Sequence, residues 1–320
     1  MDLGLTKSIG RKSNLLAVEK ISLVYCFFTA LLIFFLFPRM DHPMEMLMER
    51  LAIVGITLGL SLIGYWWPSK LMSFIRVAFQ MGLLSYWYPD TYEFNRLFEN
   101  LDHVFASWEQ VLFGFQPAVT FSSTYSKVWM SEAFHLGYFA YYPMIALVVL
   151  TYFLKQYKDF NKVAFILVGA FFLYYILYIF IPVAGPQFYF PVIGMDKVDA
   201  GIFPPIGDFF NHSQTLHPSP ITEKGIFCQL VESSQQIGER PTAAFPSSHV
   251  GISTILMILA WKGNKSVFGF MFPFYILLCG ATVYIQAHYV IDAIAGFVSA
   301  FLIYGIVAWS YKRWFERFEN

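Results

Sequence analysis

The feature that most restricts the fold of this chain is a series of long apolar runs with few charges. Eight runs are candidate membrane-crossing helices: 21–38, 51–67, 71–88, 131–154, 163–183, 247–262, 266–287 and 289–311. A helix needs about 17 to 25 residues to cross a bilayer. The composition agrees, because 57% of the 320 residues are hydrophobic and only 13% are charged, against about 25% charged in soluble domains. We therefore expect an all-α, polytopic transmembrane helix bundle with about eight spans.

Two segments need separate treatment. The run 71–88 contains Arg76 and Gln80, which makes it the weakest of the eight. The segment 102–115, DHVFASWEQVLFGF, mixes polar and aromatic residues, so we interpret it as an interfacial helix instead of a span.

The distribution of positive charge supports an even number of spans. With both ends in the cytoplasm, the inside segments carry thirteen lysines and arginines, and the longer outside segments carry seven. This asymmetry satisfies the positive-inside rule. Without 71–88 the two ends would lie on opposite sides and the agreement would be lost.

Charge and cysteine content exclude some classes of function. The formal net charge is +0, so no basic surface argues for binding to nucleic acid. The three cysteines form no CxxC pattern, and we expect no metal site. We also expect no cofactor.

Two polar motifs open two of the spans. Pro246-Ser247-Ser248-His249 stands at the start of 247–262, and His288-Tyr289-Val290-Ile291-Asp292 stands at the start of 289–311. In the predicted topology both motifs lie on the same, outer side of the membrane.

His288 and Asp292 are four residues apart, so on a helix they share one face. The Asp292 carboxylate can accept the proton of one imidazole nitrogen, which leaves the other nitrogen as a nucleophile. An ionisable residue inside a span also needs a partner, and His288 is the obvious one.

The helix 247–262 is short, at about 24 Å against a hydrocarbon core of about 30 Å. Ser247 or Ser248 can cap its first turn. The remaining N–H groups, with the positive end of the helix dipole, suit an anion such as phosphate. His249 would stand beside that anion as a proton donor.

These motifs resemble two signatures of the type-2 phosphatidic acid phosphatase superfamily, PSGH and SRxxxxxHxxxD. PSSH at 246–249 has Ser248 in the glycine position, and His288-xxx-Asp292 matches the end of the second signature. The resemblance covers about 163–311. It implies a six-helix phosphatase-like core in which His288 attacks phosphorus to give a phosphohistidine, Asp292 orients His288, and His249 protonates the leaving oxygen.

The chain departs from the superfamily pattern at two phosphate-binding cations. Ala281-Thr282 stand where the second signature has SR, and no KxxxxxxRP follows the run 163–183. A phosphate monoester carries about 1.5 to 2 negative charges at pH 7, whereas a diester carries one and needs fewer cations. The departures therefore favour a diester donor. They make the chain similar to the branch of inositol phosphorylceramide synthases and sphingomyelin synthases, sphingolipid enzymes that move a phospho-headgroup from a phospholipid to a lipid alcohol.

Three further residues are candidate substrate-binding groups beside Ser247 and Ser248. Arg240, seven residues before Ser247, can replace part of the missing charge, although a loop arginine is more often only solvated. Gln187 in the GPQ sequence can donate hydrogen bonds to phosphate or belong to a helix-ending turn. His135, one turn after Glu132, can touch a headgroup or form a structural pair with it.

The favoured function is an integral membrane lipid phosphotransferase with a phospholipid and a lipid alcohol as its partners. The alternative is a lipid phosphate phosphatase of the phosphatidate or polyprenyl pyrophosphate type, in which water attacks the same intermediate. A proton-coupled transporter would instead place its polar residues near the midplane, often within inverted repeats.

The expected organisation has two parts. Residues 1–128 would form N-terminal spans and the interfacial helix, and residues 129–320 the catalytic membrane core. The active site would face the non-cytoplasmic side, and we expect a multi-pass protein of a bacterial inner membrane.

Overall fold

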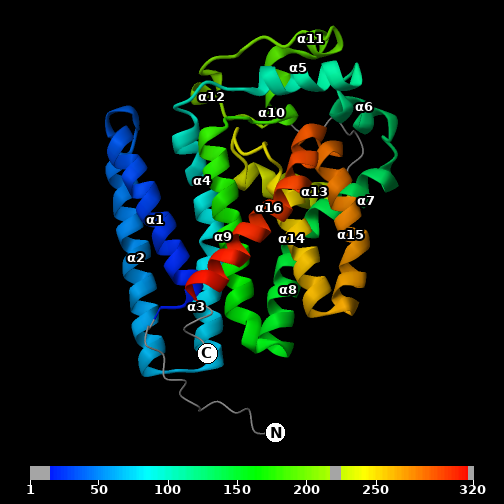
Figure 1. Cartoon of the computed structure of the whole chain (residues 1–320). Coiled ribbons are helices and arrows are strands. Elements are labelled where there is room, and N and C mark those ends of the chain that lie inside the picture. Colours follow the sequence, from blue (N-terminus) through cyan, green and yellow to red (C-terminus); the bar gives the residue numbers. More distant parts are fainter. Residues whose placement is uncertain (1–14, 217–224, 316–320) are drawn as a thin grey trace.

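The computed structural model describes residues 15–216 and 225–315, and within these ranges its regular structure is helical. Figure 1 shows long helices standing side by side, with a layer of shorter helices across one end of the bundle. In the described residues, six segments are long and apolar enough to cross a membrane: Ala17–Arg39, Pro43–Trp66, Val128–Lys155, Tyr157–Phe180, Lys265–Tyr284 and Val290–Trp314. The chain is therefore that of a multi-pass membrane protein.

Most of these segments are single helices. They are α1 (Ala17–Leu36, followed by the short 3-10 helix Phe37–Arg39), α2 (Pro43–Trp66), α9 (Tyr157–Phe180), α15 (Lys265–Tyr284) and α16 (Val290–Trp314). The segment Val128–Lys155 consists of α7 (Val128–Phe139) and α8 (Tyr141–Lys155), which meet at Ala140. Pro143 explains this break, because it has no N–H to donate to the carbonyl four residues earlier.

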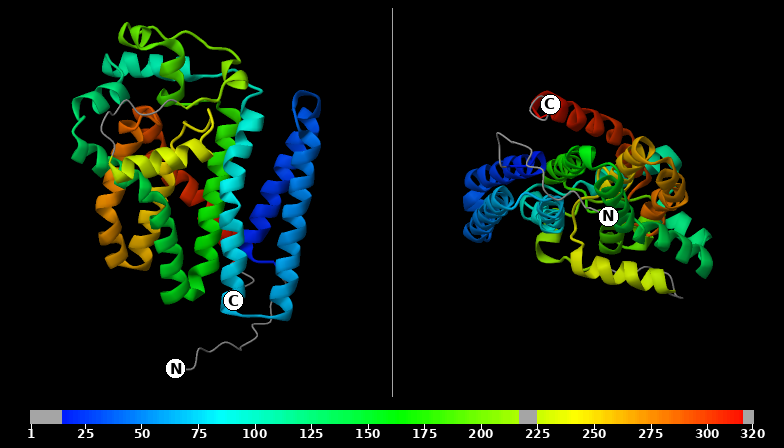
Figure 2. Two further views of the ribbon diagram at one scale, coloured as in Figure 1. Left: turned by 180° about the vertical axis from the view of Figure 1, so that it is seen from behind. Right: turned by 90° about the horizontal axis from the view of Figure 1, so that it is seen from below.

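Two predicted spans are not among the six. The run 71–88 forms two helices, α3 (Lys70–Gly82) and α4 (Leu84–Asn95), which meet at Leu83. The run 247–262 forms α14 (Ser248–Gly263), which has 16 residues. Figures 1 and 2 show that α3 and α4 together run along the bundle beside the long helices.

Arg76 and Gln80, the polar residues of the weakest predicted span, are both buried. Arg76 Nε donates to Glu19 Oε1 on α1 at 2.6 Å, and Gln80 Nε2 donates to Thr57 Oγ1 on α2 at 3.1 Å. An intramembrane charge that is paired in this way costs less than an isolated one. The polar residues therefore join α3 to its two neighbours.

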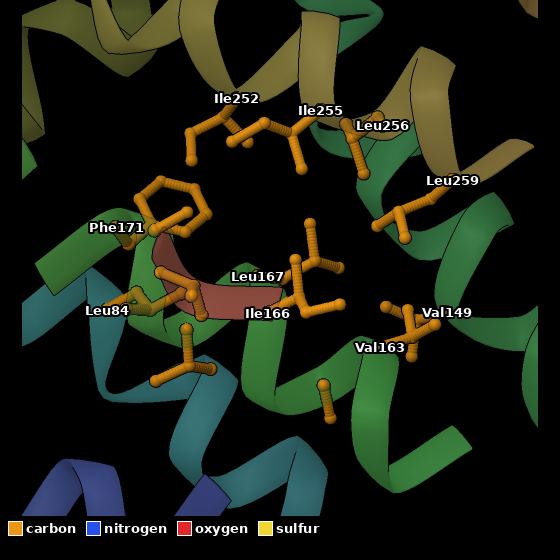
Figure 3. Close-up of a cluster of buried hydrophobic side chains, with 14 of the residues drawn as sticks. Leu84, Val149, Val163, Ile166, Leu167, Phe171, Ile252, Ile255, Leu256 and Leu259 are labelled. Atoms are coloured by element: carbon orange, nitrogen blue, oxygen red, sulfur yellow. The ribbon is translucent and has the colours of Figure 1, made fainter. Parts of the chain in front are cut away.

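Helix α9 is the centre of the bundle and is buried along most of its length. It contacts α1, α4, α8, α14 and α16. Figure 3 shows Ile252, Ile255, Leu256 and Leu259 of α14 facing Ile166, Leu167 and Phe171 of α9. Dispersion contacts of this kind drive helix association in lipid, where apolar surface alone gives little advantage.

The layer at the end of the bundle contains the connections between long helices. Its elements are α5 (Asp102–Phe113), α6 (Pro117–Thr124), α10 (Pro186–Ile193), α11 (Met195–Asp199) and α12 (Phe209–His212), and α13 (Ile226–Gly238) packs nearby on α7. Helix α5 lies across the bundle end in Figure 1. The layer thus covers the end at which α9 stops and α14 and α16 begin.

Candidate active site

Three loops meet beneath α5: the segment 182–185 after α9, the segment 243–247 before α14, and the turn 285–289 before α16. Gly185 allows the closest of these approaches. Its φ is +96°, and a Cβ at this position would lie 2.5 Å from the carbonyl oxygen of Ala287. Only glycine meets both requirements, since other residues rarely adopt positive φ.

The start of α14 is held by hydrogen bonds from several directions. Ser247 is its N-cap and accepts from the Val250 N–H at 3.4 Å, which confirms that one of the two serines caps the helix. The Ser247 N–H donates to the Asp292 carbonyl at 3.0 Å. The Ser248 N–H donates to the Tyr178 hydroxyl at 2.9 Å, and that hydroxyl donates to the Pro246 carbonyl.

This arrangement corrects the expected phosphate site at the start of α14. The N–H groups of Ser248, Val250 and Gly251 are all occupied, the last by the Ser247 carbonyl. Among the first four N–H groups, only that of His249 has no hydrogen bond to a described residue. The helix start therefore offers one N–H to an anion and not a cradle of several.

His288 is buried in the turn before α16, with 4% of its surface exposed. Its Nδ1 lies 2.8 Å from the carbonyl oxygen of Ala244, so the neutral imidazole donates from Nδ1 to that oxygen. Its own N–H donates to the Thr282 carbonyl at 3.0 Å. In the described chain Nε2 has no hydrogen-bond partner, which leaves its lone pair available.

The expected hydrogen bond between His288 and Asp292 is not formed in this structure. Asp292 Oδ2 lies 3.7 Å from His288 Nδ1 and instead accepts the Tyr289 N–H at 2.9 Å. Asp292 Oδ1 is buried without a hydrogen-bond partner among the described residues. The carboxylate therefore caps α16, and the Ala244 carbonyl is the group that fixes the imidazole tautomer.

His249 reaches the same place from α14. Its ring lies 5.8 Å from the His288 ring, centroid to centroid. On other sides it contacts Tyr138 of α7 and Tyr141 of α8, both with ring centroids 4.6 Å away. The fold thus brings together two histidines that are 39 positions apart in the sequence.

Burial shapes the electrostatics of the site. It lowers the pKa of the His288 imidazole to about 4, against the opposing effects of the Ala244 hydrogen bond and of Glu239. His288 is therefore neutral at physiological pH, as a nitrogen nucleophile must be. Burial also raises the pKa of Glu239, whose Oε2 accepts from the Tyr88 hydroxyl at 2.7 Å.

The structure places Arg240 and Gln187 near the site, with other partners. Arg240 is partly buried and its Nη1 donates to the Glu239 carbonyl at 2.9 Å. The Gln187 N–H donates to the carbonyl of Gln286 in the 285–289 turn at 2.8 Å. Its side-chain oxygen accepts from Gln235 of α13 at 3.2 Å. Gln187 therefore helps to hold the turn through its backbone.

His135 also lies on α7, but its contacts are with residues other than His249. Its Nδ1 lies 2.7 Å from the carbonyl oxygen of Ser131, and its ring stands edge-on to Tyr284. Glu132 accepts the N–H groups of Phe227 and Cys228 at 3.0 Å and so caps the start of α13. The α7 side chain that contacts His249 is Tyr138, one turn after His135.

Sequence reasoning missed Glu239 and the two carboxylates of α5, Asp102 and Glu109. Glu239 adjoins Arg240 in a loop, and no pattern separated it from a solvated charge. For α5 a signal was present: Asp102 and Glu109 are seven positions apart, hence on one face. Both are fully buried. That face points toward the site.

An apolar groove of about 390 Å³ lies beside the 285–289 turn, between α6, α15 and the start of α16. Thr120 and Phe121 line it from α6, Val283 from α15 and Val290 from α16. Val283 and Val290 flank the turn that carries His288, so the groove lies beside the loop that holds this histidine.

Comparison with known proteins identifies one family. The sequence profile of the PAP2 superfamily matches residues 103–306, a range that contains His249, His288 and Asp292. No curated protein and no solved structure matches the chain. The profile describes the superfamily as a whole, and nothing in the comparisons supports the inositol phosphorylceramide or sphingomyelin synthase branch.

Proposed function

Because the chain belongs to the PAP2 superfamily, whose members are phosphatases and phosphotransferases, we propose that it moves a phospho-headgroup from a phospholipid to a lipid alcohol through a phosphohistidine. The observation that carries the proposal is the state of His288. It is buried and neutral, its Nδ1–H is used by the Ala244 carbonyl, and its Nε2 lone pair is available beside His249.

In the first half-reaction, Nε2 of His288 attacks the phosphorus of a phosphodiester. The bond between phosphorus and the lipid alkoxide breaks, and His249 gives its proton to the departing oxygen. The negative charge of the bound phosphodiester favours the protonated form of His249. The product is a phosphoramidate on Nε2 and a free lipid alcohol.

In the second half-reaction, the hydroxyl of an acceptor lipid attacks the same phosphorus. His249, now neutral, takes the hydroxyl proton, and the bond between phosphorus and Nε2 breaks. This returns both histidines to their starting states. Asp292 acts on the step indirectly, by capping the helix that follows the nucleophile.

Two features support a diester donor and a lipid acceptor over hydrolysis of a monoester. Thr282 occupies the position at which the superfamily signature has arginine, and it contributes its backbone carbonyl to the His288 N–H instead of a charge. The apolar groove beside the 285–289 turn has the chemistry to hold an aliphatic chain. The branch assignment to sphingolipid synthases is part of this proposal.

The test uses purified protein in mixed micelles with a headgroup-labelled phospholipid, with and without ceramide or diacylglycerol. Transfer of label to the added alcohol supports the phosphotransferase. Release of free phosphate from phosphatidate or a polyprenyl pyrophosphate, without transfer, would establish the phosphatase instead.

Two histidine variants complete the test. His288→Ala should abolish both turnover and acid-labile label on the protein, because the nucleophile is gone. His212→Ala removes an exposed histidine of α12 and should leave both unchanged. Full activity in the first variant would reject the phosphohistidine mechanism.

We also propose the location of the site. In the predicted topology α3–α4 and α14 complete eight crossings, residues 129–320 form the catalytic core, and the site faces the non-cytoplasmic side of a bacterial inner membrane. The charge asymmetry of the sequence supports this orientation.

A further inference from the structure

Helix α5 buries its charges and exposes apolar side chains. Asp102 and Glu109 are 0% exposed, whereas Val111 is 85% and Leu112 66% exposed. Buried carboxylates require partners, because an unpaired charge away from water is costly. Three of the partners of Asp102 belong to the loops that form the candidate site.

Asp102 is the centre of this network and accepts four hydrogen bonds. Its Oδ2 accepts the Ala184 N–H and Asn100 Nδ2, both at 2.7 Å. Its Oδ1 accepts the Gly185 N–H at 2.8 Å and the Tyr289 hydroxyl at 3.0 Å. One side chain therefore joins α5, the segment after α9 and the turn before α16.

Two short routes lead from Asp102 to His288. The first passes through Tyr289, which is fully buried and follows His288 directly in the chain. The second passes through the segment 183–185: the Ala244 N–H donates to the Val183 carbonyl at 2.9 Å, and the Ala244 carbonyl accepts from His288 Nδ1 at 2.8 Å. Asp102 thus fixes both the backbone beside the nucleophile and the acceptor that orients its ring.

We propose that Asp102, acting through Tyr289 and through the 183–185 segment, is a positioning residue that aims Nε2 of His288 at phosphorus. The inference rests on the proposed function of His288 as the nucleophile. A nucleophile that is misplaced by about 1 Å can lose roughly 100-fold in rate, so a network that sets its position affects catalysis without touching substrate.

Two substitutions probe the network with little change of shape. Tyr289→Phe removes one hydroxyl and keeps the ring that packs on Phe105 and Phe190. Asp102→Asn keeps the outline of the side chain, but its amide NH₂ replaces one acceptor oxygen and faces N–H donors. Asp199→Asn, at an exposed carboxylate of α11, is the matched control.

The first readout is kinetic, with kcat normalised to the number of sites that become phosphorylated in a single-turnover burst. Both network variants should lose about 10- to 100-fold in kcat while KM stays within about twofold of the wild-type value. The double variant should lose less than the two single losses multiplied together, because both substitutions act on the same network. The control should match the wild type.

The second readout needs no turnover. Modification of His288 by diethylpyrocarbonate should be faster in both network variants, since the imidazole is released from Ala244. Peptide mass spectrometry measures the rate.

If folded Tyr289→Phe and Asp102→Asn proteins keep wild-type kcat per site and wild-type His288 modification, the inference is wrong. If the wild type neither turns over nor becomes phosphorylated, the proposed function fails, and the modification rates alone decide the role of Asp102. Should Asp102→Asn not fold, Tyr289→Phe decides it.

Discussion

At the scale of single residues, His288 has the two properties that its proposed role as the nucleophile requires. A histidine that attacks phosphorus must be neutral, and it must keep one tautomer so that Nε2 carries the lone pair. Burial supplies the first property and the Ala244 carbonyl supplies the second. Neither depends on a direct bond to Asp292, which leaves that carboxylate to cap α16.

The low pKa of His288 predicts an unusual pH profile. Protonation of Nε2 blocks attack, so kcat/KM falls as the pH drops through the pKa of the free enzyme. With that pKa lowered to about 4 instead of the ordinary 6.5, the acid limb should lie well below pH 6. Rates measured from pH 4.5 to 7.5, with samples returned to pH 7 to verify survival, test this. A limb centred near pH 6.5 would contradict it.

Glu109 predicts a pH dependence of stability. Its Oε1 accepts the Ile291 N–H at 3.2 Å, and burial, together with Asp292, raises its pKa from 4.5 to about 7. Since the folded pKa exceeds the unfolded one, the unfolded chain loses its proton first, and stability falls as pH rises from about 4.5 to about 7. The slope is at most about 1.4 kcal/mol per pH unit.

Glu109→Gln removes this titration and keeps an oxygen for the Ile291 N–H. The variant should gain melting temperature relative to the wild type as the pH rises from 5 to 7, and the gain should level off above about pH 7. Thermal unfolding in detergent at several pH values measures the difference. A constant difference between the two proteins across this range would show that Glu109 does not titrate there.

The residues of the site differ in how much of their role the sequence revealed. His249, His288 and Ser247 stand in short motifs whose residue types directly indicate their chemistry, and the structure brings all three together. The Ala244 carbonyl carries no side-chain signal, because any residue presents the same backbone oxygen. Glu239 was missed for a related reason: its burial depends on how the 239–247 loop folds over α7 and α4, which local pattern does not encode.

At the scale of elements, close contact between α14 and α16 sets the distance between the two motifs. Gly296 of α16 lies directly against the Ser247 carbonyl, and a Cβ there would collide with it. Small residues at such crossings let membrane helices approach. The separation of His249 and His288 therefore depends on one glycine that neither motif contains.

Gly296→Ala should push α16 away from the start of α14. We expect activity to fall by about 100-fold, the cost of a misplacement near 1 Å, together with a lower melting temperature. Gly305→Ala on the same helix is the control, since a Cβ there meets nothing within 4 Å, and it should keep full activity. Equal effects of the two substitutions would show that helix propensity, and not the α14–α16 contact, is responsible.

The elements themselves were predicted with uneven success for physical reasons. Apolar runs near 20 residues gave α1, α9, α15 and α16 within a few residues. The break at Leu83 was not predicted, because Gly82 alone is tolerated in many helices. Helix α5 was predicted as interfacial from its mixed composition, but its buried carboxylates show that its polar face points into the protein and its apolar face outward.

At the scale of the whole molecule, buried ion pairs attach the N-terminal helices to the rest of the bundle. Glu19 and Arg76 join α1 to α3 near one end, and Arg50 and Asp90 join α2 to α4 at 2.6 Å. Breaking a buried pair leaves an uncompensated charge, which costs more than the intact pair contributes. The two pairs therefore join α1 and α2 to α3 and α4, which in turn contact α9.

The arrangement of the bundle predicts on which side of the membrane each end lies. The layer that covers the site and the connection between α8 and α9 lie at opposite ends (Figure 1). The start of α1 and the end of α16 lie together, with Lys20 Nζ 5.2 Å from the Phe315 ring centroid.

With the positive charges inside, Lys197→Cys on α11 should react with a membrane-impermeant maleimide in intact cells. Lys158→Cys on α9 should react only after permeabilisation. The unsubstituted protein measures the background from the native cysteines, of which Cys26 and Cys228 are buried and Cys279 is partly buried. Labelling of the Lys158→Cys protein alone in intact cells would reverse the orientation and put the two histidines on the cytoplasmic side.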